Sequence, residues 1–501
     1  MFSEDTYYAA FKQVRNKFRK YSYHELIGES LGYINAPAKD DIESSKRHPW
    51  LVLMFVKWVL LDDSFPNKNA KLPTSSEVNA ILQLVYELSE KLRMPNEYEH
   101  VNLFFRNIAF QQFIYQIDFY YAHLSRQSIL FSGLDKNHYI CKAFRENTGL
   151  EIQEFLDLSL ATLTRFLNTN EVVMPDTWFS SVYNNYSPRK VANFLSSISK
   201  DINQIRNDLK QKDNGRRLST EHYELTSFIE YPLIKVQNKY FLTHRKILFR
   251  RFEYFVYDTL REIDAAKFMD KFGGLFERYV EKSIKYSEER YFTEIEIKKE
   301  LGAIGNQIDF LIQGGDANVF IDAKAVEMSS HGRTTHSSEI LQHATKNSIL
   351  KAIKQSHDVI KKISESKSTK IQKSENNYLL VVTYKELHLG NGTTYYEVIN
   401  KDKIDDIYDE YKEYPCIPPE NMYFITIDDL DILTSILKEE SDSLLEILDK
   451  IKEKDKRPES RKFDFRLHLV NLDTKAQTSN YLVNEKDIMF DRIINAVNSR
   501  D

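Results

Sequence analysis

The chain has 501 residues, of which 42% are hydrophobic and 29% charged, and its formal net charge at pH 7 is −5. A chain of this length exceeds what one hydrophobic core usually supports, so we expect two or three domains. The small acidic excess argues against a protein coated with basic side chains. Any contact with phosphate must therefore come from local patches.

The cysteines and the apolar segments indicate the compartment. The two cysteines, Cys141 and Cys416, lack the spacing of a zinc site, and so few cysteines favour a reducing environment. The most apolar segment, residues 50–61, is interrupted by a lysine and is shorter than the ~20 residues of a membrane span. The N-terminus lacks the apolar core of a signal peptide. We expect a cytoplasmic protein without membrane contact.

Residues 1–220 show the periodicity of successive helices. Aromatic side chains recur every three or four residues in Phe2–Tyr23, and Pro49 is well placed to start an apolar helix. Val101–Gln127 is aromatic on nearly all sides, which predicts one helix at the centre of this half. Core packing explains these aromatic residues better than a base-stacking surface does. We expect an all-α regulatory or recognition domain, which could also bind a second copy or a partner protein.

The pattern changes after the polar run Gln211–Arg217, which we take as the domain boundary. Residues 231–243 predict a β-hairpin, followed by helices over His244–Glu262 and Phe268–Tyr286. Glu294–Ile297 is predicted to be the first strand of a second core. This second domain is expected to cover residues 221–435.

A second hairpin, residues 305–324, concentrates the charged residues of interest. Two apolar runs are joined at Gln313–Asp316, where glycines supply the positive φ angles of a tight turn. Asp322 and Lys324 are two apart and share one face of their strand, and Asp309 can lie opposite them. Two acids and a lysine where apolar strands meet are costly to bury unless they have a use. The alternative is a surface hairpin in which Lys324 simply pairs with one aspartate.

The use that this chemistry favours is a divalent metal ion. Mg²⁺, or Mn²⁺, takes hard oxygen ligands and keeps several waters, so Asp309, Asp322 and the carbonyl of Ala323 would suffice. Such an ion polarises a phosphoryl oxygen and lowers the pKa of a bound water. Lys324 could then orient that water or neutralise developing negative charge.

The rest of the chain is predicted to contain a polar loop, a basic helix, two more strands and C-terminal helices. The polar loop 329–338 places Arg333 where it could contact phosphate. A helix over Ser338–Lys362 carries several lysines, of which Lys351 and Lys354 are candidate nucleic-acid contacts. Buried strands are predicted at Tyr378–Tyr384 and Met422–Ile427, and a helix at Asp428–Lys452. Residues 436–501 form a helical extension.

Asp309 followed by Asp322-Ala323-Lys324 after an apolar strand resembles the signature of the PD-(D/E)XK nuclease superfamily. In that superfamily an upstream glutamate and a downstream glutamine on helices complete the site, and Glu277 and Gln355 stand at the matching places. Ile308 replaces the proline of the signature, and the tyrosine that follows the glutamine in one branch is missing. The resemblance covers roughly residues 228–430.

The resemblance implies a restriction-endonuclease-like α/β/α core with a mixed sheet. It also implies a Mg²⁺-dependent endonuclease acting on DNA, with RNA not excluded. Asp309, Asp322, Lys324, Glu277 and Gln355 would be the catalytic residues, and Glu277 would join the metal ligands. A large helical domain joined to such a core resembles prokaryotic effectors that defend against phage. The alternatives are an endonuclease of repair, recombination or transposition, and a scaffold that binds nucleic acid without cutting it.

Overall fold

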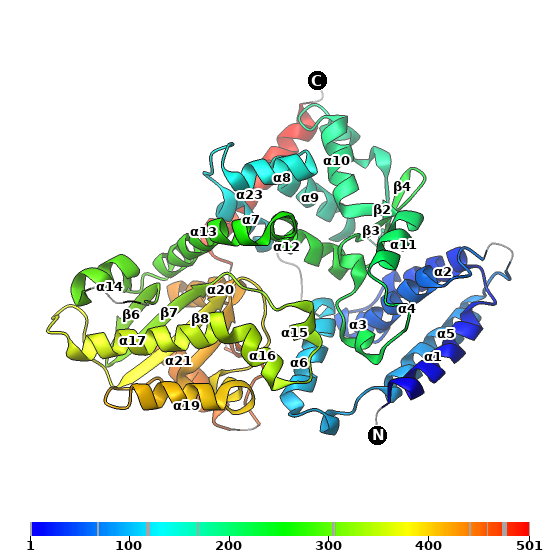
Figure 1. The fold of residues 1–501 in the computed structure, drawn as a ribbon. Helices are drawn as coiled ribbons and strands as arrows, with labels where there is room; N and C mark the ends of the chain where they lie inside the picture. The colour runs from blue at the N-terminus through cyan, green and yellow to red at the C-terminus, as the bar shows by residue number, and fades with distance from the viewer. Residues whose placement is uncertain are drawn as a thin grey trace. The chain divides into compact units, whose positions relative to one another are not determined.

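The computed structural model describes residues 3–67, 70–116, 121–167, 170–302, 305, 307–439, 442–457, 459–472 and 478–499 (Figure 1). It is a mostly helical α/β protein with two small mixed sheets. Its contacts group the chain into two compact units: the first contains Met1–Tyr98, Asn107–Ala265 and Asn484–Asp501, and the second contains Glu99–Arg106 and Ala266–Val483. The expected domain limits near residues 220 and 435 stay predictions.

Helices dominate the first unit. Its α-helices are α1 Glu4–Phe18, α2 Tyr23–Asn35, α3 Asp41–Ser45, α4 Pro49–Leu61, α5 Ser75–Leu88, α7 Ala122–Phe131, α8 Tyr139–Thr148, α9 Ile152–Leu167, α10 Pro188–Ile198, α11 Ile202–Gln211 and α12 Arg245–Ile263. Thr74 begins α5 with a capping box, in which its hydroxyl accepts from the Glu77 N–H and the Glu77 carboxylate accepts from the Thr74 N–H. Helix α4 begins with Pro49. Proline lacks a backbone N–H, and the first N–H of a helix has no partner within the helix, so no hydrogen bond is lost at this position.

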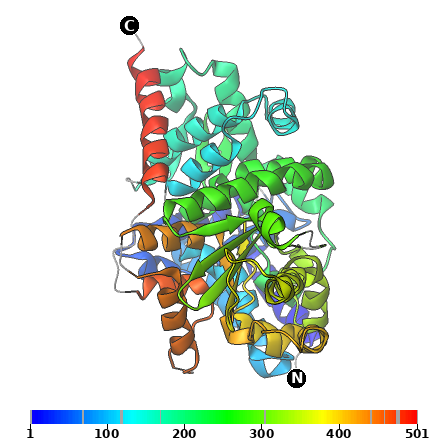
Figure 2. The ribbon, with the colours of Figure 1, turned by 90° about the vertical axis from the view of Figure 1, so that its left-hand side faces the viewer.

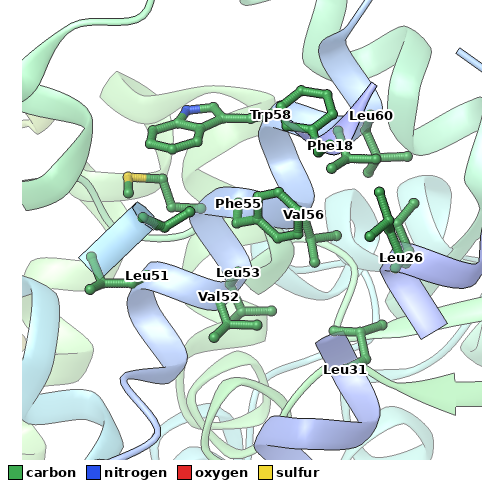
Figure 3. Close-up of a cluster of buried hydrophobic side chains, with 14 of the residues drawn as sticks. Phe18, Leu26, Leu31, Leu51, Val52, Leu53, Phe55, Val56, Trp58 and Leu60 are labelled. Carbon is green, nitrogen blue, oxygen red and sulfur yellow. The ribbon is translucent and has the colours of Figure 1, made fainter. Parts of the chain in front are cut away.

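Helices α1, α2, α4 and α5 share one hydrophobic core (Figure 3). Phe55 and Trp58 of α4 are almost fully buried and meet aromatic rings of α1 edge-on. The ring centroids of Phe18 and Phe55 are 5.8 Å apart, and those of Phe11 and Trp58 are 5.1 Å apart. Apart from Lys57, helix α4 is apolar on all sides, as expected for a helix at the centre of its neighbours. In the part of the chain that the structure describes, none of the helices combines the length and the apolar character needed to cross a membrane.

The first unit also contains a four-stranded sheet of order β1-β4-β3-β2. The predicted hairpin is confirmed as β3 Leu233–Val236 and β4 Lys239–Leu242, with Gln237 in the left-handed region at φ 52°. Strands β1 Val173–Pro175 and β2 Ser199–Asp201 extend this hairpin on either side. The expectation of an all-α first domain is therefore wrong in this respect. These strands have three residues each, too few to show an alternating pattern.

The aromatic segment 101–127 is not one central helix. Helix α6 spans Val101–Gln112, a 3₁₀ turn spans Phe113–Tyr115, and α7 begins at Ala122. Phe119 and Tyr120, which the prediction counted in this helix, lie outside the described residues. Phe105 is 50% exposed, so aromatic density alone did not imply burial on every side. The two parts of α6 also belong to different units, with the division between Arg106 and Asn107.

The chain ends in helix α23, Asn480–Asn498, whose larger part belongs to the first unit. Arg492 forms a bidentate pair with the buried carboxylate of Asp157, with N–O distances of 2.9 and 3.0 Å. The hydroxyl of Ser128 donates to Glu485 at 2.5 Å. A buried charge with a bidentate partner is costly to leave alone, so these contacts hold the C-terminal helix in place.

The second unit is an α/β structure. Its helices are α13 Ala265–Tyr286, α14 Glu294–Leu301, α15 Ser330–Thr334, α16 Ser338–Thr345, α17 Lys351–Glu365, α18 Gly392–Thr394, α19 Lys401–Glu410, α20 Ile427–Glu439, α21 Leu444–Asp455 and α22 Phe465–Val470, with π-helical segments at Lys346–Leu350 and Tyr395–Asn400. Its strands are β5 Tyr291–Thr293, β6 Phe310–Gly314, β7 Ala317–Lys324, β8 Asn376–Thr383 and β9 Met422–Thr426.

The five strands form a mixed sheet of order β5-β6-β7-β8-β9. Strands β5, β6 and β7 are antiparallel, whereas β7, β8 and β9 are parallel. The predicted hairpin and both predicted buried strands are confirmed, with Gly315 supplying the positive φ of the turn. Helix α17 lies on one face of the sheet and helices α20 and α21 lie on the other, as the two views show (Figure 2).

Two predicted elements of this unit are wrong. Glu294–Ile297 begins helix α14 rather than forming a strand, because Thr293 and Glu296 form a capping box that starts a helix. The preceding residues Tyr291–Thr293 form the edge strand instead. The expected single helix over Asp428–Lys452 is two helices, α20 and α21, and the second has its own capping box from Ser443 to Glu446.

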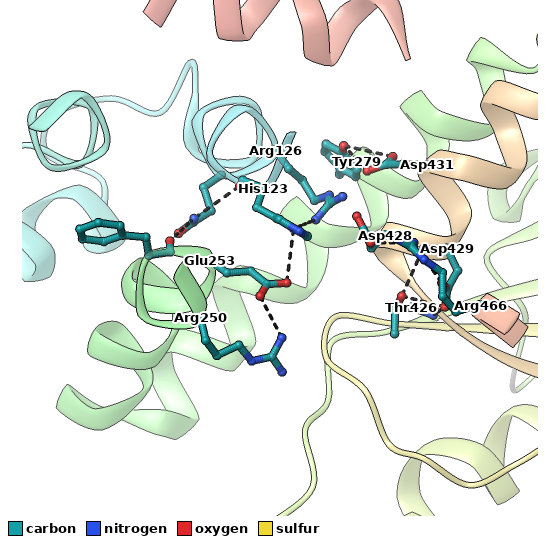
Figure 4. A network of polar contacts seen from close by, with 12 residues as sticks. His123, Arg126, Arg250, Glu253, Tyr279, Thr426, Asp428, Asp429, Asp431 and Arg466 are labelled. Atoms are coloured by element: carbon teal, nitrogen blue, oxygen red, sulfur yellow. Dashed lines mark hydrogen bonds and ion pairs between the residues drawn. The ribbon is translucent and has the colours of Figure 1, made fainter. Parts of the chain in front are cut away.

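A buried polar network fixes α13 against α20 within the second unit (Figure 4). The Tyr279 hydroxyl donates to Asp431 at 2.9 Å, and the Ser283 hydroxyl donates to the same carboxylate at 2.8 Å. Next to it, Arg466 forms an ion pair with Asp428 at 2.7 Å. Because Tyr279 lies half a turn beyond Glu277 on α13, this network also sets the position of Glu277.

We predict that Phe55→Ala destabilises the first unit by about 3–5 kcal/mol, the usual cost of deleting a fully buried phenylalanine. Chemical denaturation of the full chain would measure the loss. Ile42→Ala is the control, because Ile42 is 69% exposed, and we expect a change of less than about 0.5 kcal/mol. Equal effects of the two substitutions would contradict the assignment of α4 to the core.

Candidate active site

Two aspartates lie opposite each other at the end of the β6–β7 hairpin that is farthest from its turn. Asp309 directly precedes β6, and the pairing of Phe310 with Ile321 places it opposite Asp322. An Asp309 carboxylate oxygen accepts a hydrogen bond from the Ala323 N–H at 2.6 Å. Asp322 is 1% exposed, and among the described residues neither of its oxygens accepts a well-aligned hydrogen bond. Its carboxylate therefore has unused acceptor capacity in a buried place.

Lys324 links the aspartates to helix α17. Its Nζ lies 2.5 Å from an Asp322 oxygen and donates to the side-chain oxygen of Gln355 at 3.3 Å. The Gln355 side-chain nitrogen in turn donates to the backbone carbonyl of Gln307. The chain of contacts from Asp322 through Lys324 and Gln355 returns to the segment that carries Asp309. The structure thus brings together the three residues of the hairpin and the predicted glutamine.

Burial raises the pKa of both carboxyl groups. Burial, and then the nearby charge of Asp322, raise the pKa of Asp309 to about 8, against the opposing hydrogen bond from Ala323. Burial also raises the pKa of Asp322, and Lys324 opposes that rise. Strongly shifted groups of this kind cluster at functional sites, because stability alone does not favour them.

Glu277 lies on α13 at the edge of this group. Burial raises its pKa, and Glu294, Glu281 and Asp322 add to the rise through their charges. Glu277 also raises the pKa of Asp309, so it is within electrostatic reach of both aspartates. Its position is that of a third, outer carboxylate.

The predicted basic contacts divide into three kinds. Lys351, exposed at the start of α17, is close enough to lower the pKa of Asp322. Lys354 pairs with Glu410 of α19 at 2.8 Å. Arg333 lies in the short helix α15, within the segment predicted to be a loop, and its Nε donates to the Met328 carbonyl at 3.0 Å. Of the three, Lys351 acts electrostatically on Asp322, and the contact of all three residues with nucleic acid stays a prediction.

Sequence reasoning missed two features of this site. The predicted helix Ser338–Lys362 is interrupted by the π-helical segment Lys346–Leu350, which shifts the register just before Lys351 and Gln355. Such segments are frequent at functional sites, but they leave little trace in a hydrophobic pattern. The second is Gln307, 7% exposed, whose side-chain nitrogen and oxygen have no hydrogen-bond partner among the described residues. In the sequence, the only indication that Gln307 belongs to the site is its position two residues before Asp309.

The residues present fit a hard divalent cation with few protein ligands. In the described part of the chain, no group of three or more His, Cys, Asp and Glu side chains is placed to hold a metal. Mg²⁺ does not need such a group, since one or two carboxylates plus waters and substrate phosphate suffice. The carboxylates of Asp322 and Asp309 meet that need. The Ala323 carbonyl remains a predicted ligand, whereas its N–H binds Asp309.

Comparisons with known proteins add no relative. No protein-family model matches the chain, and no curated protein matches it. Inference about function therefore rests on the arrangement of Asp309, Asp322, Lys324 and Gln355.

We predict that the metal-free protein loses stability as the pH rises from about 4 to 8. The folded state holds protons on Asp309 and Asp322 that the unfolded chain has already released at its ordinary carboxyl pKa, so ionising them favours unfolding. Thermal unfolding across this range would show the slope. Asp322→Asn, which removes the like charge, should flatten it.

Asp316→Asn is the matched control, because Asp316 is exposed in the turn between the same two strands. This variant should keep the wild-type slope. Mg²⁺ added at pH 8 should raise the melting temperature of the wild type and of Asp316→Asn, but not that of Asp322→Asn. Identical slopes for all three proteins would contradict the coupling of the two aspartates.

Proposed function

We propose that the protein is a divalent-metal-dependent nuclease that hydrolyses phosphodiester bonds of DNA. The observation that carries the proposal is the buried Asp309–Asp322 pair, with Lys324 2.5 Å from Asp322 and held by Gln355. A cation neutralises a carboxylate pair of this kind, and a lysine beside it suits a reaction in which negative charge develops on phosphate. The resemblance to the PD-(D/E)XK signature supports the same reaction and favours DNA as substrate.

Each residue has a separate task in this proposal. Asp309 and Asp322 would hold the cation, and the Ala323 N–H fixes the orientation of Asp309. A cation bound there would supply Lewis-acid stabilisation of negative charge on the phosphate. The Lys324 ammonium stands within reach of the same region, where it stabilises negative charge or orients the attacking water. Gln355 positions Lys324, and Glu277 adds an outer carboxylate that can accept a proton.

The mixed sheet supports the finer description of the fold as a restriction-endonuclease-like core. An antiparallel hairpin carries the acidic residues, parallel strands β8 and β9 follow, and helices cover both faces. Of the residues that act in the proposed reaction, Asp309 directly precedes β6, Asp322 and Lys324 lie on β7, and Glu277 and Gln355 lie on helices α13 and α17. By the same resemblance we assign the chain to the effectors that cut foreign DNA such as phage DNA.

We predict that purified protein cleaves DNA in Mg²⁺ or Mn²⁺ and that EDTA abolishes the cleavage. Asp322→Ala and Lys324→Ala should reduce the rate to background. Gln355→Ala and Glu277→Gln, which act through other groups, should lower it by about 10–100-fold. Gel assays on plasmid and linear DNA would measure all four variants. Wild-type rates for Asp322→Ala would show that the site is assigned wrongly, and cleavage by metal-stripped protein would refute the metal requirement.

Lys351 is predicted to contact a phosphate of the bound DNA. Lys351→Ala should weaken binding and reduce the slope of log affinity against log salt by about one, the contribution of one phosphate contact. Fluorescence anisotropy with Ca²⁺ in place of Mg²⁺ would measure binding without cleavage. Lys456→Ala, at the end of α21 on the other face of the sheet, is the control and should leave the slope unchanged. Equal slopes for both variants would exclude Lys351 from the interface.

A further inference from the structure

The first unit contains a pocket that shares no residue with the carboxylate site. Its volume is about 410 Å³, and it is bounded by α2, the Lys46–His48 segment, the first turn of α4, and α5. Pockets that bind small molecules have volumes of about 300–1,000 Å³. This one is therefore large enough for a ligand of the size of a nucleotide.

The floor of the pocket is apolar and two of its walls are aromatic. Leu51 and Val52 of α4 line the pocket and are buried, so they form part of its floor. Figure 3 labels both residues on that helix. Tyr33 of α2 and Tyr86 of α5 line the sides and are 39% and 44% exposed. Exposed tyrosine rings beside an apolar floor offer flat surfaces for another flat ring.

The rim of the same pocket carries cations and amides. Lys46 is exposed, and Arg47 donates to the backbone carbonyl of Pro37 at 2.9 Å and lies 3.9 Å from Glu43. Asn79 and Gln83 project from one face of α5, one turn apart, and the Gln83 amide nitrogen donates to Glu87 at 3.1 Å, which leaves the Asn79 amide for a ligand. A cation suits a phosphate group, and an amide, which both donates and accepts, suits the edge of a nucleobase.

His48 is held in an unusual conformation at the wall of this pocket. Its backbone is left-handed, with φ 48° and ψ 58°, although it is not glycine and precedes Pro49. Its ring lies 5.0 Å from that of Tyr86 and 5.3 Å from that of Trp50. Left-handed non-glycine residues are often found where function requires a particular side-chain direction. Here the conformation places the His48 ring against Tyr86.

We infer that this pocket binds a nucleoside phosphate, with the base stacked on Tyr86 and the phosphate at Lys46. A bare phosphate would leave the aromatic walls unused, and a purely apolar ligand would leave the cations and amides at the rim unused. The combination of a flat apolar interior with a cationic rim matches one ligand that is aromatic at one end and anionic at the other. The inference stands apart from the nuclease proposal, because no residue is common to the two sites.

The experiment titrates the full-length protein, in metal-free buffer, with the 5′-monophosphates of adenosine, guanosine, cytidine and uridine. Trp50 adjoins His48, so its fluorescence should report occupancy, with isothermal calorimetry as a second measurement. Adenosine and ribose 5-phosphate are the two partial ligands. We expect at least one nucleotide to bind with a dissociation constant below about 1 mM, and both partial ligands to bind more weakly than it.

Four variants test the placement of the ligand. Tyr86→Ala should weaken binding by about 5- to 100-fold, the range expected for loss of one stacking ring, whereas Tyr86→Phe keeps the ring and should stay within about threefold. Lys46→Glu should weaken nucleotide binding but not adenosine binding. Lys39→Glu makes the same charge change at an exposed lysine that does not line the pocket, and should have no effect.

The inference is overturned if none of the four nucleotides binds, if ribose 5-phosphate binds as tightly as the nucleotide, or if Tyr86→Ala and Lys46→Glu bind like the wild type. Asp322→Ala should bind nucleotide with unchanged affinity. Loss of binding in that variant alone would place the nucleotide at the carboxylate site and refute the pocket. A protein that binds nucleotide but does not cut DNA would refute the proposed nuclease and leave this inference standing.

Discussion

The burial of two neighbouring carboxyl groups is the constraint on which this part of the second unit depends. Asp309 and Asp322 raise the free energy of the folded chain wherever both are ionised, and hydrophobic packing does nothing to relieve that cost. The surrounding contacts are arranged to limit it. The Ala323 N–H holds one carboxylate, and the Lys324 ammonium partly neutralises the other. What remains is a strained site whose cost a bound cation would relieve.

The remaining architecture keeps this strained site in a rigid frame. Strand β7 pairs with a strand on each side, so Asp322 and Lys324 cannot shift independently of the sheet. Gln355 reaches the site from α17, where its side chain contacts both Lys324 and the Gln307 carbonyl. The hydrogen bonds from Tyr279 and Ser283 to Asp431 hold α13 against α20. Rigid support of this kind is what preorganised catalytic groups require.

The sequence was informative where local chemistry determines local structure. The glycines at 314 and 315 marked the turn, and the alternation of Asp322 with Lys324 placed both on one face, as the structure confirms. The short strands β1 and β2 depend on pairing with residues distant in the chain, and no local pattern announces that pairing. At Glu294–Ile297 the alternating isoleucines favoured a strand, but the capping box of Thr293 and Glu296 starts helix α14. This helix-start signal is present in the sequence.

The way the chain is divided between the two units has a consequence for its modularity. The chain passes between units at Tyr98–Glu99, Arg106–Asn107, Ala265–Ala266 and Val483–Asn484. Any contiguous fragment that contains the whole of one unit therefore also contains part of the other. A gene fusion that transplanted residues 266–483 would leave behind the first turns of α6, and one that ended the chain before Arg492 would remove the charged partner of buried Asp157. The two units are therefore not separable modules in the way of domains that follow one another along the chain.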